Sequence, residues 1–151
     1  MEKISFIGCG SWGGALGKVL SDKGYLVKMW HRDKEIVSSL ELTRKHYIIP
    51  ELVFNKNVSF THDLIDAVDY STIIILAIHS QTIRSVLEKI PAIFQAEKTI
   101  VNVSKGIEID TLMTISQIVK DIGCNSNSKF VTLSGPSHAE EVIKQFPTTS
   151  L

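Results

Sequence analysis

The sequence predicts an α/β domain built on a doubly wound, mainly parallel sheet, on the basis of three observations. Short apolar runs alternate with stretches whose apolar residues have helical spacing, which is typical of βαβ units. The clearest run, Tyr70–Ala77, is apolar on both faces, as in a strand covered by helices on both sides. A glycine-rich turn, Gly8–Gly14, directly follows the first apolar run.

The first half of the chain is expected to alternate strands with helices. Four apolar residues between positions 15 and 20 have helical spacing, and Gly24 is suited to end that helix. Asp33 is suited to cap the next helix at its N-terminus. In chain order, the expected elements are a strand at Ile4–Ile7, the helix that Gly24 ends, a strand at Leu26–Trp30, a helix at Glu35–Leu40, a strand at Val58–Thr61, a helix at Asp63–Val68 and the strand at Tyr70–Ala77.

The second half continues this alternation. In chain order, it is expected to hold a helix at Ile83–Ile90, a strand at Thr99–Val103, a helix at Leu112–Ile122 ended by Gly123, a strand at Phe130–Leu133 and a helix at Ala139–Lys144. A further extended segment is expected to start at Thr148, after Pro147. A domain seldom ends on an unfinished strand, so we expect residues 1–151 to be one domain at the front of a longer protein.

The charges of the chain balance, with 16 basic and 16 acidic residues among 151. No basic cluster is present, so nothing electrostatic points to nucleic acid or a membrane surface as a partner. No apolar run approaches the ~20 residues of a membrane-spanning helix. The only two cysteines, Cys9 and Cys124, make no disulfide framework, which indicates a cytoplasmic protein with free thiols. The five histidines do not have metal-ligand spacing, and no metal site is expected.

Gly8, Gly10 and Gly13 form the pattern G-x-G-x-x-G between a predicted strand and a predicted helix. In the Rossmann-type dinucleotide-binding fold, the first glycine makes the tight turn and the second lets a pyrophosphate approach the backbone. The third lets the helix pack on the strand. The free N–H groups at the start of the helix would then face the phosphates. Ser11 could donate a hydroxyl to a phosphate or cap the helix, and Trp12 could cover the cofactor or join the core.

The end of the second predicted strand bears on which dinucleotide binds. An acidic residue about 20 residues after the glycines usually binds the ribose 2′-hydroxyl of NAD. Here His31 and Arg32 stand next to the strand end, and an arginine suits a 2′-phosphate. Asp33 could bind the ribose, but a role as the N-cap of the next helix explains an aspartate at this position equally well. The sequence therefore favours NADP(H), with NAD(H) as the alternative.

Two later strand ends carry further polar residues. Ligands bind beyond the carboxyl ends of strands in open α/β sheets. Lys105 follows the predicted strand at 99–103 and would suit an anionic or polarised substrate oxygen; the alternative is an ordinary surface lysine. Gly135 and Ser137 follow the strand at 130–133 and could hold a phosphate, unless they form only a turn. His138 is interpreted as the residue that starts a helix.

Together these residues resemble one known family, the bacterial NAD(P)-dependent sn-glycerol-3-phosphate dehydrogenases. The resemblance follows the family's motif order over nearly the whole chain. Its most specific parts are the pieces Ser104–Glu108 and Ser134–Val142. The other matching pieces are the glycine loop Gly8–Gly13, the strand end Trp30–Arg32, Ser80-Gln81 with Arg84, and Pro147–Thr149.

The resemblance implies reversible hydride exchange between a nicotinamide cofactor and a small phosphorylated substrate. It implies that dihydroxyacetone phosphate and sn-glycerol 3-phosphate interconvert, and that the product supplies phospholipid synthesis. By motif match, the cofactor would be held by Ser11, Trp12, His31, Arg32, Tyr47, Lys105 and Ala139. Lys105 would also touch the substrate as the catalytic candidate of this chain, together with Gly135 and Ser137 as substrate-binding residues.

The sequence departs from the family at three points. The family usually has threonine where Gly14 stands and proline where His79 stands. The family's general-base lysine lies in a C-terminal helical domain, which is absent from this chain. We therefore expect the chain alone to bind cofactor but to turn over substrate at no more than a trace rate. Apolar surface left exposed without that domain would allow a homodimer.

Two other functions remain alternatives. One is the front domain of a related dehydrogenase that acts on a hydroxy acid such as 3-hydroxyisobutyrate or 6-phosphogluconate; such enzymes would lack the pieces Ser104–Glu108 and Ser134–Val142. The other is a dinucleotide-binding or redox-sensing module without chemistry. The neutral charge and the lack of a basic helix argue against such a sensor.

Overall fold

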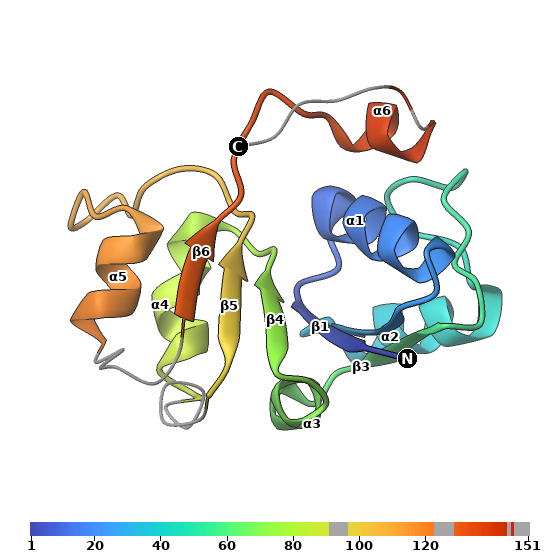
Figure 1. Ribbon diagram of the computed structural model, residues 1–151, viewed down its shortest axis with the longest axis horizontal. Helices are drawn as coiled ribbons and strands as arrows, with labels where there is room; N and C mark the ends of the chain where they lie inside the picture. The colour runs from blue at the N-terminus through green and yellow to red at the C-terminus, as the bar shows by residue number, and fades with distance from the viewer. Residues whose placement is uncertain (91–96, 123–128, 145, 147–151) are drawn as a thin grey trace.

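The computed structural model describes residues 1–90, 97–122, 129–144 and 146. Its described strands form one sheet in the order β3-β2-β1-β4-β5-β6, and every neighbouring pair is parallel (Figure 1). The strands are β1 (Lys3–Ile7), β2 (Leu26–Trp30), β3 (Val58–Thr61), β4 (Ile73–Leu76), β5 (Thr99–Asn102) and β6 (Lys129–Thr132). The expected doubly wound sheet is confirmed, and its described part is parallel throughout rather than mainly parallel.

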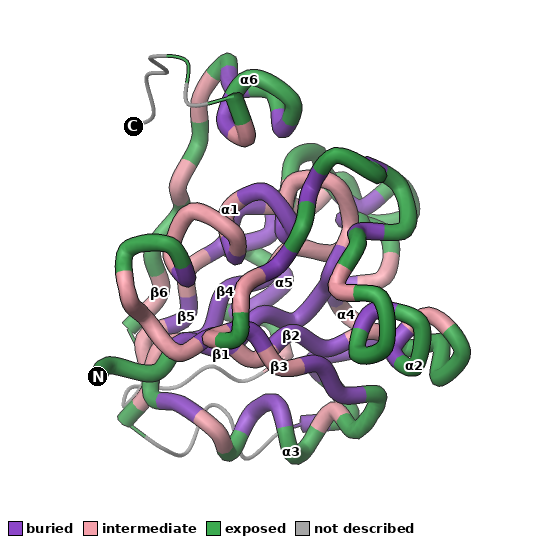
Figure 2. The backbone as a smooth tube through the Cα atoms, turned by 90° about the vertical axis from the view of Figure 1, so that its right-hand side faces the viewer, coloured by how far each residue is buried: buried purple, intermediate pink, exposed green. Residues whose placement is uncertain are grey.

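Helices cover the sheet on both faces. The helices are α1 (Ser11–Asp22), α2 (Lys34–Thr43), α3 (Leu64–Asp69), α4 (Ser80–Leu87), α5 (Ile115–Asp121) and α6 (Ala139–Ile143). Side chains alternate along each strand, so Phe6 packs toward α1 and α2 while the adjacent Ile7 packs toward α3 and α4. This alternation builds two apolar clusters, one on each face, and places the buried strands at the centre of the molecule (Figure 2). None of the described helices is long and apolar enough to cross a bilayer.

Local side-chain hydrogen bonds fix where several helices begin. The Asp33 carboxylate accepts the N–H groups of Glu35 and Ile36, as expected for the cap of α2. Asp63 caps α3 in the same way. Thr114 and Gln117 form a reciprocal capping box at the start of α5.

The expected bounds of four elements were wrong by about one helical turn or less. Helix α2 continues to Thr43 rather than ending at Leu40. Strand β4 begins at Ile73 rather than Tyr70, because Tyr70 ends α3 and the Ser71 hydroxyl bonds the backbone of Lys3 and Ile73. Helix α5 begins at Ile115 rather than Leu112, because Leu112 has a left-handed φ of 57° and belongs to a closed loop before the helix.

Helix α4 covers Ser80–Leu87 rather than Ile83–Ile90, because it begins directly at the strand-end loop. Strand β5 ends at Asn102, β6 covers Lys129–Thr132, and α6 ends at Ile143, each within one residue of expectation. The predictions for Gly123, Pro147 and Thr148 lie outside the described residues.

The strand order places a switch point at the carboxyl ends of β1 and β4. Connections from β1 run to one side of the sheet through β2 and β3, and those from β4 run to the other side through β5 and β6. Loops that leave β1 and β4 therefore diverge and open a crevice between them, where ligands bind in folds of this kind.

Candidate functional site

The glycine loop after β1 is fitted tightly between its neighbours. Gly8 has a φ of 115°, and a Cβ atom placed on it would lie 2.3 Å from the carbonyl oxygen of Ala77. Its N–H donates to the carbonyl oxygen of Trp30 at 3.2 Å. A Cβ atom on Gly13 would lie 2.8 Å from the carbonyl oxygen of Gly8. The packing of this chain therefore requires glycine at positions 8 and 13.

Gly10 is different, because nothing in the described chain requires it. A Cβ atom placed there would meet no heavy atom within 4 Å, and its backbone is extended, with φ −73° and ψ −174°. A side chain would be tolerated sterically and conformationally. In a dinucleotide-binding loop the second glycine leaves room for the pyrophosphate to approach the backbone, and the open space at Gly10 fits that role.

Gly10 is also the N-cap of α1, and no side chain caps this helix. The first N–H groups of a helix have no partner within the helix, and they carry the positive end of its dipole. Ser11 and Trp12 occupy the first turn and are both half-buried, and Trp12 packs against the apolar core. The open space at Gly10 thus lies at the end of a 12-residue helix suited to bind an anion.

The end of β2 brings together three of the predicted cofactor residues. The Tyr47 hydroxyl lies 3.2 Å from Nε2 of His31, and the two rings meet edge to face. Arg32 is exposed and forms no ion pair within the part of the chain that the structure describes. The Asp33 carboxylate is occupied as the α2 cap. Arg32 is therefore the charged side chain at this strand end that remains available to a ligand.

A buried histidine that the sequence analysis did not single out lies behind this group. His46 is 2% exposed and connects the segment after α2 to the glycine loop. Its Nε2 lies 3.0 Å from the carbonyl oxygen of Cys9, and its ring stacks on Tyr47 at a centroid distance of 4.9 Å. Burial lowers the pKa of His46 from its ordinary value.

The loop after β5 presents Lys105 toward the segment after β6. The Asn102 side chain accepts the N–H of Ser104 at 3.1 Å, and the next glycine, Gly106, has a φ of 105°. Nζ of Lys105 donates to the carbonyl oxygen of Ser137 at 3.4 Å. Lys105 and Gly135 also line one open cavity of about 420 Å³, together with hydroxyl groups from β6 and α5. The structure therefore brings together the three residues expected to contact substrate.

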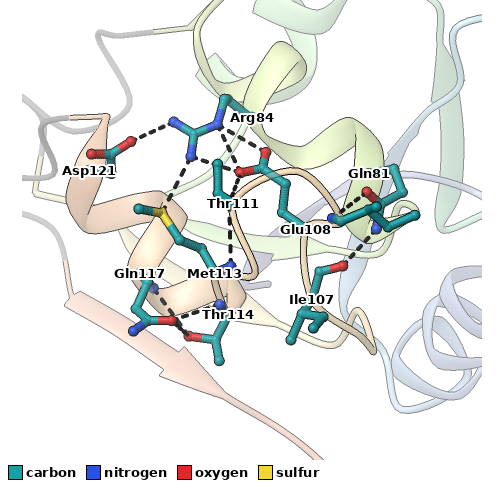
Figure 3. Close-up of polar contacts among 10 residues, drawn as sticks. Gln81, Arg84, Ile107, Glu108, Thr111, Met113, Thr114, Gln117 and Asp121 are labelled. Carbon is teal, nitrogen blue, oxygen red and sulfur yellow. Dashed lines mark hydrogen bonds and ion pairs between the residues drawn. The ribbon is translucent and has the colours of Figure 1, made fainter.

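Helix α4 bonds the loop between β5 and α5 through two side chains, Gln81 and Arg84 (Figure 3). The Gln81 amide bonds the backbone on both sides of Glu108, donating to the carbonyl oxygen of Ile107 at 2.6 Å and accepting the N–H of Ile109 at 2.9 Å. Arg84 makes a two-pronged contact with the Glu108 carboxylate and also pairs with Asp121 of α5.

The Arg84 guanidinium, assisted by the Thr111 hydroxyl, holds the pKa of Glu108 below its ordinary value. Gln81, Arg84 and Glu108 entered the sequence analysis only as parts of matching motifs. The structure shows that they contact one another or the loop backbone, so they hold residues 107–109 of the loop that also carries Lys105.

The segment after β6 crosses back over the sheet to α1. Ser137 and Ala139 are buried, and α6 packs against α1 (Figure 1). His138 is the N-cap residue of α6, with extended backbone and no side-chain cap, as expected for a residue that starts a helix. Ala139 and Trp12 belong to the same apolar cluster, which places Ala139 on the glycine-loop side of the molecule.

Cys9 contributes its backbone rather than a reactive thiol. The thiol is 1% exposed, and burial raises its pKa to about 12. Among residues 1–90, 97–122, 129–144 and 146, no group of three or more histidine, cysteine or acidic side chains is placed to hold a metal ion.

A parallel sheet in this order, with a glycine-rich loop and an uncapped helix at its switch point, defines a Rossmann-type α/β domain, the class that binds dinucleotides. A family model described as the N-terminus of NAD-dependent glycerol-3-phosphate dehydrogenase matches residues 3–151. The chain therefore belongs to the NAD-dependent glycerol-3-phosphate dehydrogenase family, of which it represents the N-terminal part.

Individual relatives agree with this assignment. The chain is 40% identical over 150 residues to a protein of Fusobacterium nucleatum named glycerol-3-phosphate dehydrogenase [NAD(P)+], and it covers 45% of that protein. A crystal structure of glycerol-3-phosphate dehydrogenase from Coxiella burnetii has the same fold, with a TM-score of 0.88 over 99% of this chain at 24% identity. A yeast glycerol-3-phosphate dehydrogenase has a TM-score of 0.82 at 23% identity. The chain thus spans less than half the length of the relatives it matches.

Proposed function

We propose that this chain binds a nicotinamide dinucleotide, with the pyrophosphate against Gly10 and the first turn of α1. The observation that carries the proposal is the contrast among the three glycines. Gly8 and Gly13 are required by the packing of the chain, whereas Gly10 has open space where its side chain would be. A phosphate against the free N–H groups of an uncapped helix accounts for that space.

The predicted site residues would contact different parts of the cofactor. Ser11 and Trp12 would lie at the pyrophosphate, and His31, Arg32 and Tyr47 would lie at the adenosine end. Ala139 would lie at the nicotinamide end. In support, Tyr47 contacts His31 at the end of β2, and Ala139 packs on the glycine-loop side of the molecule.

We infer a preference for NADP(H) over NAD(H) from Arg32. Its guanidinium is exposed and free of ion pairs within the described residues, and the nearest carboxylate in sequence, Asp33, is engaged as a helix cap. An arginine in this place favours the additional phosphate of NADP(H), because its planar guanidinium binds phosphate through two parallel hydrogen bonds.

We propose that the whole protein interconverts dihydroxyacetone phosphate and sn-glycerol 3-phosphate in the cytoplasm and supplies phospholipid synthesis. The bound cofactor would supply or accept the hydride. Lys105 would polarise the substrate oxygen, and Gly135 and Ser137 would form one wall of the substrate site. Lys105 and Gly135 line one cavity, and Lys105 contacts Ser137, which supports this assignment. A general base would come from a second, helical domain, since the relatives are more than twice as long as this chain. A homodimer is compatible with this assignment.

Replacing Gly10 tests the binding site. Gly10→Val should leave the chain folded, because the backbone at position 10 is extended and the space is open. Dinucleotide binding, measured by calorimetry with NADPH and NADH, should be abolished because the valine would occupy the space of the pyrophosphate. Gly13→Val is the matched control, and it should destabilise the fold itself. Unchanged NADPH affinity in folded Gly10→Val would refute the assignment.

A further inference from the structure

His46 is held by hydrogen bonds on both ring nitrogens. Nδ1 accepts the N–H groups of Ile48 and Ile49, each at 3.1 Å, so it carries no proton. In the neutral ring the proton then lies on Nε2, which donates it to the carbonyl oxygen of Cys9 at 3.0 Å. The ring therefore connects two backbone segments that are 37 residues apart in sequence.

The Cys9 carbonyl matters because it belongs to the same peptide group as the N–H of Gly10. The C=O and N–H bonds of a trans peptide point in opposite directions across one rigid plane. A hydrogen bond that holds the Cys9 carbonyl toward His46 therefore turns the Gly10 N–H away from His46. In a loop of glycines, where the backbone is otherwise free to rotate, such an anchor decides which way this group faces.

The ring of His46 also occupies the space beside Gly14. A Cβ atom placed on Gly14 would lie 2.6 Å from Cδ2 and 2.7 Å from Nε2 of His46. Three hydrogen bonds fix the ring, so it cannot move aside without losing them. The ring of His46 thus requires glycine at position 14.

We propose that His46 is a positioning residue of the nucleotide site, which orients the Cys9–Gly10 peptide and holds Tyr47 beside His31, and that it requires glycine at position 14. This inference rests on the proposed dinucleotide site. His46 stacks on Tyr47, whose hydroxyl contacts His31, so one ring organises both the pyrophosphate end and the adenosine end of the site.

A double-mutant cycle tests the pairing of Gly14 with His46. Serine at position 46 removes Cδ2 and Nε2, the two ring atoms that a Cβ atom on Gly14 would meet most closely, and with them the donor to Cys9. Its hydroxyl can still accept an N–H group of the turn at Ile48 and Ile49. Gly14→Ala should lower the melting temperature and weaken NADPH binding about ten-fold or more, because the methyl group overlaps the ring. In the His46→Ser background, Gly14→Ala should change both quantities little, because the ring atoms that the methyl group would overlap are gone.

His46→Ser alone should weaken NADPH binding several-fold, whereas His62→Ser, at an exposed histidine, should leave affinity unchanged. His46→Gln, which can reach the Cys9 carbonyl, should bind NADPH more tightly than His46→Ser if its fold is retained. Nitrogen chemical shifts of the unmodified chain should show the proton of His46 on Nε2.

Each outcome decides a separate point. The proposal would be overturned if Gly14→Ala lowered the melting temperature and the NADPH affinity equally in the two backgrounds. A proton on Nδ1 of His46 would also overturn it. Normal NADPH affinity in His46→Ser would likewise overturn it, by showing that the histidine stabilises the fold alone. If the unmodified chain binds neither NADPH nor NADH, the proposed function fails, while coupling in the melting temperatures would still decide whether Gly14 and His46 compete for the same space.

Discussion

At the scale of single residues, Arg32 and Asp33 follow the same strand but differ in their contacts: Asp33 caps α2, whereas Arg32 is exposed. Asp33 accepts two N–H groups of α2, and its position is explained by the helix alone. Arg32 has no such local explanation within the described residues, since it is exposed and unpaired there. The sequence left Asp33 open between a helix cap and a ribose contact, and the geometry favours the cap.

Arg32→Ala should therefore reduce NADPH affinity while leaving NADH affinity nearly unchanged. One charge-assisted contact to phosphate is worth about 1.5–3 kcal/mol, so NADPH binding should weaken by ten-fold or more. Calorimetry with both cofactors measures the ratio, and Lys34→Ala, which removes an exposed positive charge two residues away, is the control. A preference for NADPH that survives in Arg32→Ala would show that another group selects the cofactor.

His46 also makes the stability of the chain depend on pH. Burial lowers its pKa below the ordinary 6.5, so the folded state favours the neutral ring. Its contribution is complete above pH 6.5 and is lost as the pH falls from 6.5 through the pKa of the folded state. The free energy of unfolding, measured with denaturant, should decrease over this range. His46→Ser should flatten part of the decrease, and the remainder is expected from His31, whose pKa burial also lowers.

At the scale of elements, the sequence predicted best where apolar pattern alone determines structure. Strands β2 and β3 have the predicted bounds, because each is a buried run with clear turn residues on both sides. The starts of β4 and α5 were missed, because a serine hydroxyl and a left-handed leucine decide them. The contact between His46 and Gly14 joins segments distant in sequence, so no local pattern could have indicated it.

Replacing Arg84 of α4, which bonds Glu108, should remove the pH-dependent part of the free energy of unfolding that this ion pair contributes. The bond from Arg84 lowers the pKa of Glu108, so this stabilisation is present above pH 4.5 and is lost as the pH falls through the lowered pKa. Arg84→Met should decrease the free energy of unfolding at neutral pH and flatten its decrease in acid. Ser85→Ala, at an exposed neighbour on α4, is the control. Equal acid sensitivity in Arg84→Met and the unmodified chain would contradict this role.

At the scale of the whole molecule, the two halves of the sheet each contribute one side of the site. Strands β1 and β2 carry the glycine loop and Arg32, whereas β5 and β6 carry Lys105 and the segment with Ser137. The segment after β6 returns to α1, which joins the two sides (Figure 1). The parts assembled here are suited to hold a cofactor and one wall of a substrate site.

Hydride transfer also needs a group that handles the alcohol proton, held in near-attack geometry. We therefore expect the chain alone to oxidise NADPH with dihydroxyacetone phosphate at no more than a trace rate, although it binds the cofactor. A protein of the full length of its relatives should show turnover in the same absorbance assay. Comparable rates for the two would place the general base within these 151 residues.

The most direct measurement is a titration of the isotope-labelled chain with NADPH, followed through backbone amide signals. The account predicts that the largest changes occur at Gly10, Ser11, Trp12 and Gly13, where a pyrophosphate would meet the start of α1, with a second group of changes around Arg32. Binding that leaves the amides of residues 10–13 unchanged, or no binding at all, would contradict the claim that this glycine loop holds a dinucleotide.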